Sequence, residues 1–212
     1  MTASTRQHGG VQPRTFDELI GAARSGDRDA VASLWRAEHP RLVRVLRGLV
    51  GDAGEDVASQ TWLEVMGVLP RFQGDERGFR ALVFTIARRR VADHRRSLRR
   101  KPAVPMAPGD LATATPLHLT TGLDVASGVE GDEAVALIQE LLPSHQAEIV
   151  LLRVVGGLSV DDVAGIVGRS SGAVRVQQHR ALKRLADRMS ALRPIDPDNP
   201  APDVTDRRAA GW

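Results

Sequence analysis

The sequence predicts an all-α fold with two small helical domains joined by a flexible linker. Aromatic residues make up only 3% of the 212 residues and Tyr is absent, which suits a helical core of Leu, Val, Ile and Ala better than a β-sandwich. Apolar residues recur at helical spacing in 15–101 and again in 131–193. The stretch 102–130 is rich in Pro, Thr, Ala and Gly and keeps no period, so we expect it to be the linker.

The first domain opens with two helices. Thr15 and Glu18 form a capping box, in which a hydroxyl and a carboxylate satisfy the free amides of a helix start. A second helix is expected from about Asp29 to Val50, kinked or split near Glu38 by Pro40. Its apolar stripe consists of Val31, Leu34, Leu42, Val45, Leu46 and Leu49.

Two further helices complete this domain. The third is expected over Asp52–Leu69, opened by a cap at Asp52 and Glu55 and ended by Pro70. The fourth is expected over Phe79–Arg100, with an apolar stripe and a basic face on opposite sides. The stripe is Val83, Ile86, Ala87, Val91 and Leu98, and the basic face includes Arg88, Arg95, Arg96 and Arg99.

The second domain begins where helical periodicity resumes, at about Glu133. Pro143 interrupts the pattern, and a helix over Gln146–Val155 follows. Residues 1–14 and 194–212 lack any period and carry many Gly, Pro, Ser, Thr or Asp, so we expect both to be disordered.

The most specific local pattern is a helix-turn-helix over Val160–Leu185. Ser159 caps its first helix, Ala164 lets the two helices approach closely, and Gly168 can take the positive φ of a tight turn. Ser170 and Ser171 cap the second helix, which runs to about Met189. The core between the helices is expected from Val163, Ile166, Val167, Val174, Leu182 and Leu185.

The second helix of this motif has a face suited to the major groove of DNA. Arginine there can bond guanine O6 and N7, and Arg169 together with the helix N-terminus can meet phosphates. An ordinary helical hairpin with a Gly turn is the alternative. The predicted face consists of Ser171, Arg175, Val176, His179 and Arg180.

Charge supports two nucleic-acid contacts, although the net charge is only +3. Basic residues gather in 79–101 and 169–193, whereas 102–133 has acids but no Lys or Arg. The alternative is that both basic blocks are merely solvated helix faces.

Several functional classes are disfavoured. The chain has no Cys, no apolar run of the ~18 residues that span a membrane and no secretory signal, so we expect a cytoplasmic protein. His residues show no metal spacing, and Asp161 and Asp162 are explained by a helix N-terminus. We therefore expect no catalytic residue, no metal and no cofactor.

Residues 142–185 resemble region 4 of extracytoplasmic-function sigma factors, from Leu142-Pro143 through Gly157-Leu158-Ser159 to His179-Arg180-Ala181. Residues 34–72 look like regions 2.1 and 2.2 of the same family, and 79–100 look like regions 2.3 and 2.4. The matching residues there are Glu55-Asp56, Thr61, Ile86-Ala87-Arg88, Asp93 and Arg96. The resemblance implies a factor that recruits RNA polymerase to promoter DNA, with 15–101 as region 2 and 131–193 as region 4.

The resemblance also implies a role for each surface. The Asp52–Leu69 helix would dock on the clamp coiled coil of the largest polymerase subunits, and region 4 would bind the β flap and the −35 element. The loop Arg71–Gly78 would receive a flipped base, with Phe72 and Trp62 expected in the core. Polymerase contacts would be Glu55, Asp56, Gln60 and Thr61; −10 contacts would be Arg88, Arg89, Arg95, Arg96 and Arg99; −35 contacts would be Arg169, Ser171, Arg175, Val176, His179 and Arg180.

Three positions depart from the family pattern: Leu82 stands for Trp, Arg89 for Asn, and Ser59-Gln60 for Gln-Glu. Two other functions fit the motif, a helix-turn-helix regulator whose N-terminal helices sense a ligand or dimerise, and an adaptor that uses the motif for protein contacts. The resemblance also implies an anti-sigma factor that clamps both domains. The alternatives are control by expression level or by the 194–212 tail.

Overall fold

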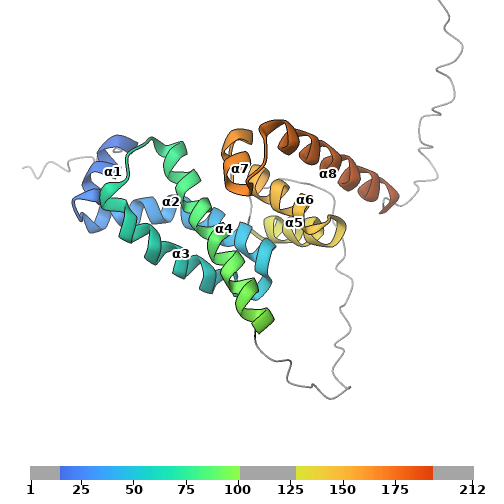
Figure 1. Cartoon of the computed structure of the whole chain (residues 1–212), viewed down its shortest axis with the longest axis horizontal. Helices are drawn as coiled ribbons and strands as arrows, with labels where there is room; N and C mark the ends of the chain where they lie inside the picture. Colours follow the sequence, from blue (N-terminus) through green and yellow to red (C-terminus); the bar gives the residue numbers. More distant parts are fainter. Residues whose placement is uncertain (1–14, 101–127, 193–212) are drawn as a thin grey trace, which may run out of the picture.

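The computed structural model describes residues 15–100 and 128–192, in which every regular element is helical (Figure 1). The all-α prediction is confirmed. Two helical units lie side by side, the first holding α1 to α4 and the second α5 to α8. Helices of the first unit are α1 (Phe16–Arg24), α2 (Arg28–Val50), α3 (Gly54–Val68) and α4 (Glu76–Arg100). Helices of the second unit are α5 (Gly128–Leu141), α6 (Ser144–Val150), α7 (Val160–Val167) and α8 (Ser171–Leu192).

The capping signals in the sequence begin two of these helices. At α1, Thr15 Oγ1 accepts a hydrogen bond from the Glu18 amide, and the Glu18 carboxylate accepts one from the Thr15 amide at 2.8 Å. Ser159 and Asp162 form the same reciprocal box at α7. Both caps use groups within three residues, so local sequence was sufficient to predict them.

The second helix was predicted to kink or split near Pro40, and the split is wrong, because α2 runs unbroken from Arg28 to Val50. Proline in a helix interior costs about 3 kcal/mol. Contacts on either side of Pro40 offset that cost, since Leu34 and Leu42 are buried and Glu38 is held by Arg80. Tertiary packing therefore overrides the local signal.

The predicted cap at Asp52 is also wrong. A 3₁₀ turn, η1 (Gly51–Ala53), leads directly into α3, and no side chain caps the helix start. Gly51 takes a φ of +63°. A Cβ on Gly54 would stand 2.8 Å from the Arg47 amide nitrogen, so the turn depends on close backbone approach rather than on capping.

A single continuous apolar core runs through both units. Trp62 is 7% exposed, which confirms the prediction that it belongs to the core. Leu98 and Leu182 were predicted to be buried, but they are 55% and 44% exposed. Leu98 lies where α4 extends past its neighbours, and Leu182 lines an open groove described below.

In the second unit, α6 continues into a π-helical turn, η3 (Leu151–Val155), before the helix-turn-helix. Gly168 ends α7 in the left-handed conformation, with φ 67° and ψ 42°, as predicted. α5 begins at Gly128, inside the segment expected to be linker. The rest of that linker and the two termini expected to be disordered lie outside the described residues.

Candidate nucleic-acid and polymerase interfaces

The helix-turn-helix is fixed by apolar contacts beside its turn. Val174 of α8 and Val163 of α7 are fully buried, and Ala164 and Ile166 are nearly so. The left-handed Gly168 reverses the chain between the two helices. This packing sets the angle at which α8 leaves the protein surface, and so determines which of its side chains face outward.

The outward face of α8 contains four of the five residues that the sequence predicted, all except Ser171. Arg175, His179 and Arg180 are exposed, and Val176 is 49% exposed. Arg169 is exposed in the preceding turn. Val176 is thus an apolar side chain flanked by cations and an imidazole. This combination fits the major groove, which offers hydrogen-bonding base edges and thymine methyl groups.

Neighbouring polar residues of α8 face the protein. Ser171 is half-buried, and its hydroxyl donates to the Asp161 carboxylate at 2.6 Å. Gln177 accepts a hydrogen bond from Gln146, and Gln178 accepts one from Arg153, both at 3.2 Å. Of the predicted face on α8, the residues free to contact DNA are therefore Arg175, Val176, His179 and Arg180.

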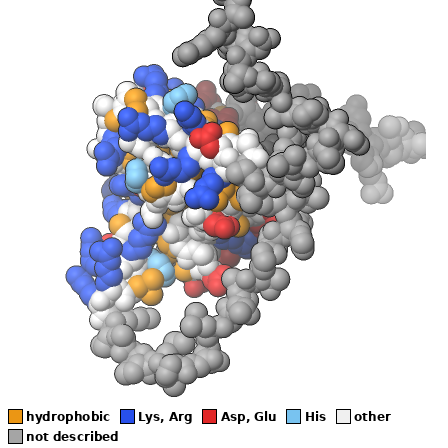
Figure 2. Space-filling view, turned by 90° about the vertical axis from the view of Figure 1, so that its right-hand side faces the viewer, with side chains coloured by type: hydrophobic (Ala, Val, Ile, Leu, Met, Phe, Trp, Pro, Cys, Tyr) orange, Lys and Arg blue, Asp and Glu red, His pale blue; other side chains and the backbone are white. Residues whose placement is uncertain are grey.

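Lys and Arg side chains gather along one edge of the molecule. Figure 2 shows an upper group at the level of α8 and a lower group where α4 ends. The exposed cations of α8 include Arg175, Arg180, Lys183, Arg184 and Arg188, and those of α4 include Arg89, Arg95, Arg96, Arg99 and Arg100.

Most of the predicted −10 arginines have partners inside the protein. Arg88 donates to Glu148 of the second unit at 2.8 Å. Arg95 donates to the Leu49 carbonyl at 2.9 Å. Arg89 pairs with Glu64, which also pairs with Arg90, a residue outside the predicted set, and Arg96 pairs with Asp93.

Helix α3 presents a mixed surface opposite its buried side. Asp56 and Gln60 are exposed there, as is Glu55, whose carboxylate pairs with Arg47 at 3.1 Å. Thr61 does not belong to this surface. It is fully buried, and its hydroxyl donates to the Val57 carbonyl at 2.7 Å.

Sequence reasoning missed an exposed apolar residue on the same face. Leu63 is 76% exposed, far more than the core leucines, and follows Gln60 by almost one helical turn. The helical spacing of Asp56, Gln60 and Leu63 could have revealed it. A single exposed leucine is common on protein surfaces, so its interest here is that it lies in line with Asp56 and Gln60.

His39 lies beside this surface. Its ring stacks on Trp35 with 4.2 Å between centroids, and its Nε2 lies 3.8 Å from the Glu55 carboxylate. Burial lowers the pKa of His39 and nearby Glu55 raises it, with a net result below the ordinary value.

A hollow of about 350 Å³ lies at the loop between α3 and α4. Phe72 is half-buried at its edge and packs against Phe79 in an edge-to-face arrangement, with 5.6 Å between centroids. The hollow therefore combines one aromatic ring with polar and apolar walls. Its lining residues are Gly67, Val68, Arg71, Phe72, Gln73 and Leu82.

An apolar groove of about 220 Å³ runs between α5, η3 and α8. Val154 and Leu182 are exposed within it. Its other walls include Leu137, Ile138, Leu185 and Met189. Exposed apolar grooves of this kind bind amphipathic helices or loops.

Within 15–100 and 128–192, no His, Asp and Glu side chains cluster in a way that could hold a metal ion. No helix in those ranges is both long and apolar enough to cross a membrane.

Two protein-family models match the chain in sequence order. The model described as Sigma-70 region 2 matches residues 34–101, and the model described as Sigma-70, region 4 matches residues 133–185. The first match contains the α3 face and all of α4, and the second contains the helix-turn-helix.

Similar proteins carry related names. The ECF RNA polymerase sigma factor SigD of Mycobacterium tuberculosis H37Rv is 35% identical over 190 residues, covering 85% of this chain and 87% of SigD. The ECF RNA polymerase sigma factor ShbA of Streptomyces griseus is 37% identical over 175 residues, covering 79% of this chain and 91% of ShbA.

Among solved structures, the sigma factor RpoE of Bartonella quintana, crystallised with the anti-sigma factor NepR, has a similar fold. Its TM-score is 0.56 at 19% sequence identity, covering 76% of this chain and 98% of RpoE.

Proposed function

The chain belongs to the family of extracytoplasmic-function (ECF) RNA polymerase sigma factors, and we propose how its surfaces divide the work of promoter-specific initiation. The family matches span both units, which favours this function over a regulator with a sensory or dimerising N-terminal half. The following paragraphs assign each surface to one contact.

Helix α8 reads the −35 element. The observation that carries this assignment is the exposed face of Arg175, Val176, His179 and Arg180 on the second helix of a tightly packed helix-turn-helix. Arg175 and Arg180 are the base-reading candidates, whereas Arg169 precedes the helix and suits a phosphate. Ser171 donates to Asp161 and so stabilises the start of α8 instead of contacting DNA.

Helix α4 and the hollow beside it bind the −10 element. Arg88, Arg89, Arg95, Arg96 and Arg99 lie on one helix, along which a DNA backbone can run. The hollow between Arg71, Gln73 and Leu82 can receive an unstacked base. The Phe72 ring is half-buried and Leu82 has no ring, so an unstacked base in the hollow stacks weakly. The chain alone should therefore melt promoter DNA only modestly.

Core polymerase is held through two surfaces. Glu55, Asp56 and Gln60 on α3, together with exposed Leu63, face the clamp coiled coil of the largest subunits. The apolar groove around Leu182 receives the tip of the β flap. An anti-sigma factor that covered both surfaces would block both contacts, so we propose one as a further partner.

The protein acts without chemistry of its own. We propose that it is not an enzyme, needs no cofactor and works in the cytoplasm, because its partners are core polymerase and DNA. RNA synthesis is supplied by the polymerase to which it binds.

Reconstituted transcription tests the proposal. Purified full-length chain is mixed with core RNA polymerase from its source organism and with genomic fragments, and transcript starts are mapped. We expect starts at a defined set of promoters only when the chain is present. Arg175→Ala combined with Arg180→Ala should abolish those starts while leaving core binding unchanged. Arg188→Ala, which removes an exposed cation two turns further along α8, is the matched control.

Starts that do not depend on the chain, or a double variant that keeps the same start sites, would refute the −35 assignment. Loss of starts with the Arg188→Ala control would show that the effect reflects general charge rather than base reading.

A further inference from the structure

Helix α8 turns a partly polar face toward the protein in the stretch that is proposed to read DNA. Its fully buried residues there are Val174 and Ala181, which are two helical turns apart. Gln177 and Gln178 lie between them and are half-buried on the same side. Valine and alanine are small, and apolar contact has no preferred direction. These two contacts alone therefore fix the rotation of α8 about its own axis only weakly.

A buried amide on α6 contacts this face of α8 at two points. Gln146 is only 6% exposed. Its Nε2 atom donates to Gln177 Oε1 at 3.2 Å, and its Oε1 atom accepts from Arg184 Nη1 at 3.4 Å. Gln177 and Arg184 are two turns apart on one side of α8. A buried amide that loses its partners costs free energy, so a rotation that carries both partners away is opposed.

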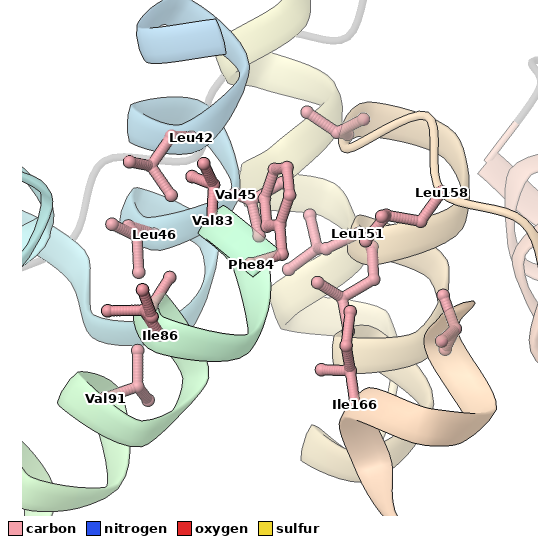
Figure 3. Packing of buried hydrophobic residues seen from close by; sticks show 14 of the residues in the cluster. Leu42, Val45, Leu46, Val83, Phe84, Ile86, Val91, Leu151, Leu158 and Ile166 are labelled. Carbon is pink, nitrogen blue, oxygen red and sulfur yellow. The ribbon is translucent and has the colours of Figure 1, made fainter. Parts of the chain in front are cut away.

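An arginine provides the third polar contact to α8. Arg153 lies in the π-helical turn η3, and its Nε atom donates to Gln178 Oε1 at 3.2 Å. Its Nη1 atom donates to the Leu158 carbonyl, directly before the cap of α7. Leu158 is buried in the apolar core, as are Leu151 and Ile166 (Figure 3). Because the guanidinium is planar and its donors keep a fixed geometry, Arg153 links the position of α8 to the start of α7.

The rotation of α8 decides which base edges its outward side chains can reach. The two held glutamines stand between Val176 and His179 in the sequence. A side chain extends about 5–6 Å from the helix axis, so a rotation of about 20° moves its tip by about 2 Å. A base contact of Arg175 does not survive such a shift, because donor and acceptor must stay within about 3.2 Å.

We propose that Gln146 and Arg153 are positioning residues, which fix the rotation of α8 and through it the choice of −35 base pairs. Both side chains act from the inner side of α8, opposite the face proposed to read DNA. The inference rests on the proposed function of α8 and deepens it. It concerns the choice between sequences, since Arg169 lies in the turn before α8 and its proposed phosphate contact does not involve these bonds.

Replacement of the buried amide tests this role. Gln146→Met keeps an unbranched side chain of similar length and removes both bonds, while Gln177 and Arg184 remain able to reach water. Holoenzyme made from the full-length chain and core RNA polymerase is used in competition binding. The competitors are the promoter and fragments that carry each single −35 substitution. We expect the preference at one base pair or more to fall by about tenfold, the size of one bidentate base contact. Binding to unrelated DNA should stay the same.

His145→Met is the matched control, because this residue is the exposed neighbour of Gln146 on α6. It should leave both the −35 preference and the thermal midpoint unchanged. Arg153→Lys is the second test variant. It keeps the positive charge, but an ammonium cannot reproduce the fork that bonds Gln178 and Leu158 together. We expect it to lose preference as Gln146→Met does, so the loss cannot be assigned to charge.

A double variant separates positioning from direct base reading by Gln177. If Gln177 acts only through its bond to Gln146, adding Gln177→Met to Gln146→Met should cause no further loss of preference. If Gln177 contacts a base itself, the two losses should add. Additive losses would overturn the positioning role of Gln146.

A measurement without DNA keeps this inference apart from the proposed function. Residual dipolar couplings of the α8 amides report its orientation relative to α7, and we expect a change in Gln146→Met and Arg153→Lys but none in His145→Met. An unchanged orientation, or an unchanged −35 preference in folded variants, would overturn the inference. So would an unfolded Gln146→Met chain beside a folded Arg153→Lys chain of normal preference. Wild-type holoenzyme without any −35 preference would refute the proposed function, and the couplings would still decide whether the two residues orient α8.

Discussion

Loss of the Arg80 guanidinium should strongly destabilise the region 2 unit. Its Nε and Nη2 atoms donate to the Glu38 carboxylate at distances of 2.8–3.1 Å, and Glu38 is only 3% exposed. Replacing Arg80 with Met keeps the apolar stem but leaves a buried carboxylate without its main partner. Breaking such a pair costs about 3–5 kcal/mol.

The surroundings place this variant at the low end of that range. Arg41 lies 3.8 Å from Glu38 and is half exposed, so it can partly compensate. The second partner of Arg80, Glu76, is 62% exposed and contributes at most about 1 kcal/mol. We therefore expect Arg80→Met to lower the free energy of unfolding by about 3 kcal/mol.

Urea unfolding followed by circular dichroism measures the effect. Glu76→Gln is the control and should change the free energy of unfolding by less than about 1 kcal/mol. Adding Glu38→Leu to Arg80→Met should recover most of the loss, because the buried charge is then removed as well. A loss below about 1 kcal/mol for Arg80→Met, or no recovery in the double variant, would refute this reasoning.

Three further predictions concern surfaces and pH. Leu63→Asp should weaken binding to core polymerase measured by pull-down, whereas Thr61→Val, at a buried site, should leave it unchanged if the protein folds. Arg175→Ala should cost about 1–3 kcal/mol at one −35 base pair in a competition binding assay, whereas Arg169→Ala should weaken all sequences alike and flatten the salt dependence. Burial lowers the pKa of His39, so the unfolded chain binds more protons and the free energy of unfolding should decline as pH falls below about 6.5. His39→Gln should flatten that decline in urea titrations at different pH values, and an unchanged slope would contradict this role.

Local signals in the sequence predicted local features well. Ser159 and Asp162 cap α7 through atoms three residues apart, and Gly168 takes the backbone conformation that its turn demands. Leu63 is exposed and Thr61 buried although both lie on α3, since partners distant in sequence decide which face is covered. Such contacts depend on the whole fold.

The same difference between local and distant contacts explains why the contact between the two units was not predicted. Nothing in the sequence near Gly48 indicated that α2 would meet Leu151 of the other unit, because the partners are a hundred residues apart. The isolated glycine inside a helical pattern was the one available signal. Its reason lies in the fold, because the second unit occupies the space where a side chain would stand.

The internal pairing of the α4 arginines has a consequence for how this protein meets DNA. Glu64 on α3 pairs with both Arg89 and Arg90 and so offsets one of their two charges, and Asp93 pairs with Arg96. A phosphate that binds these arginines must displace a carboxylate. Carboxylates then take the place of some counterions, so DNA binding at −10 changes less with salt concentration than the number of arginines implies. The slope of affinity against salt therefore understates the number of phosphate contacts. Such a surface attracts arbitrary DNA weakly, and its arginines engage phosphates chiefly where other contacts have already fixed the duplex beside α4.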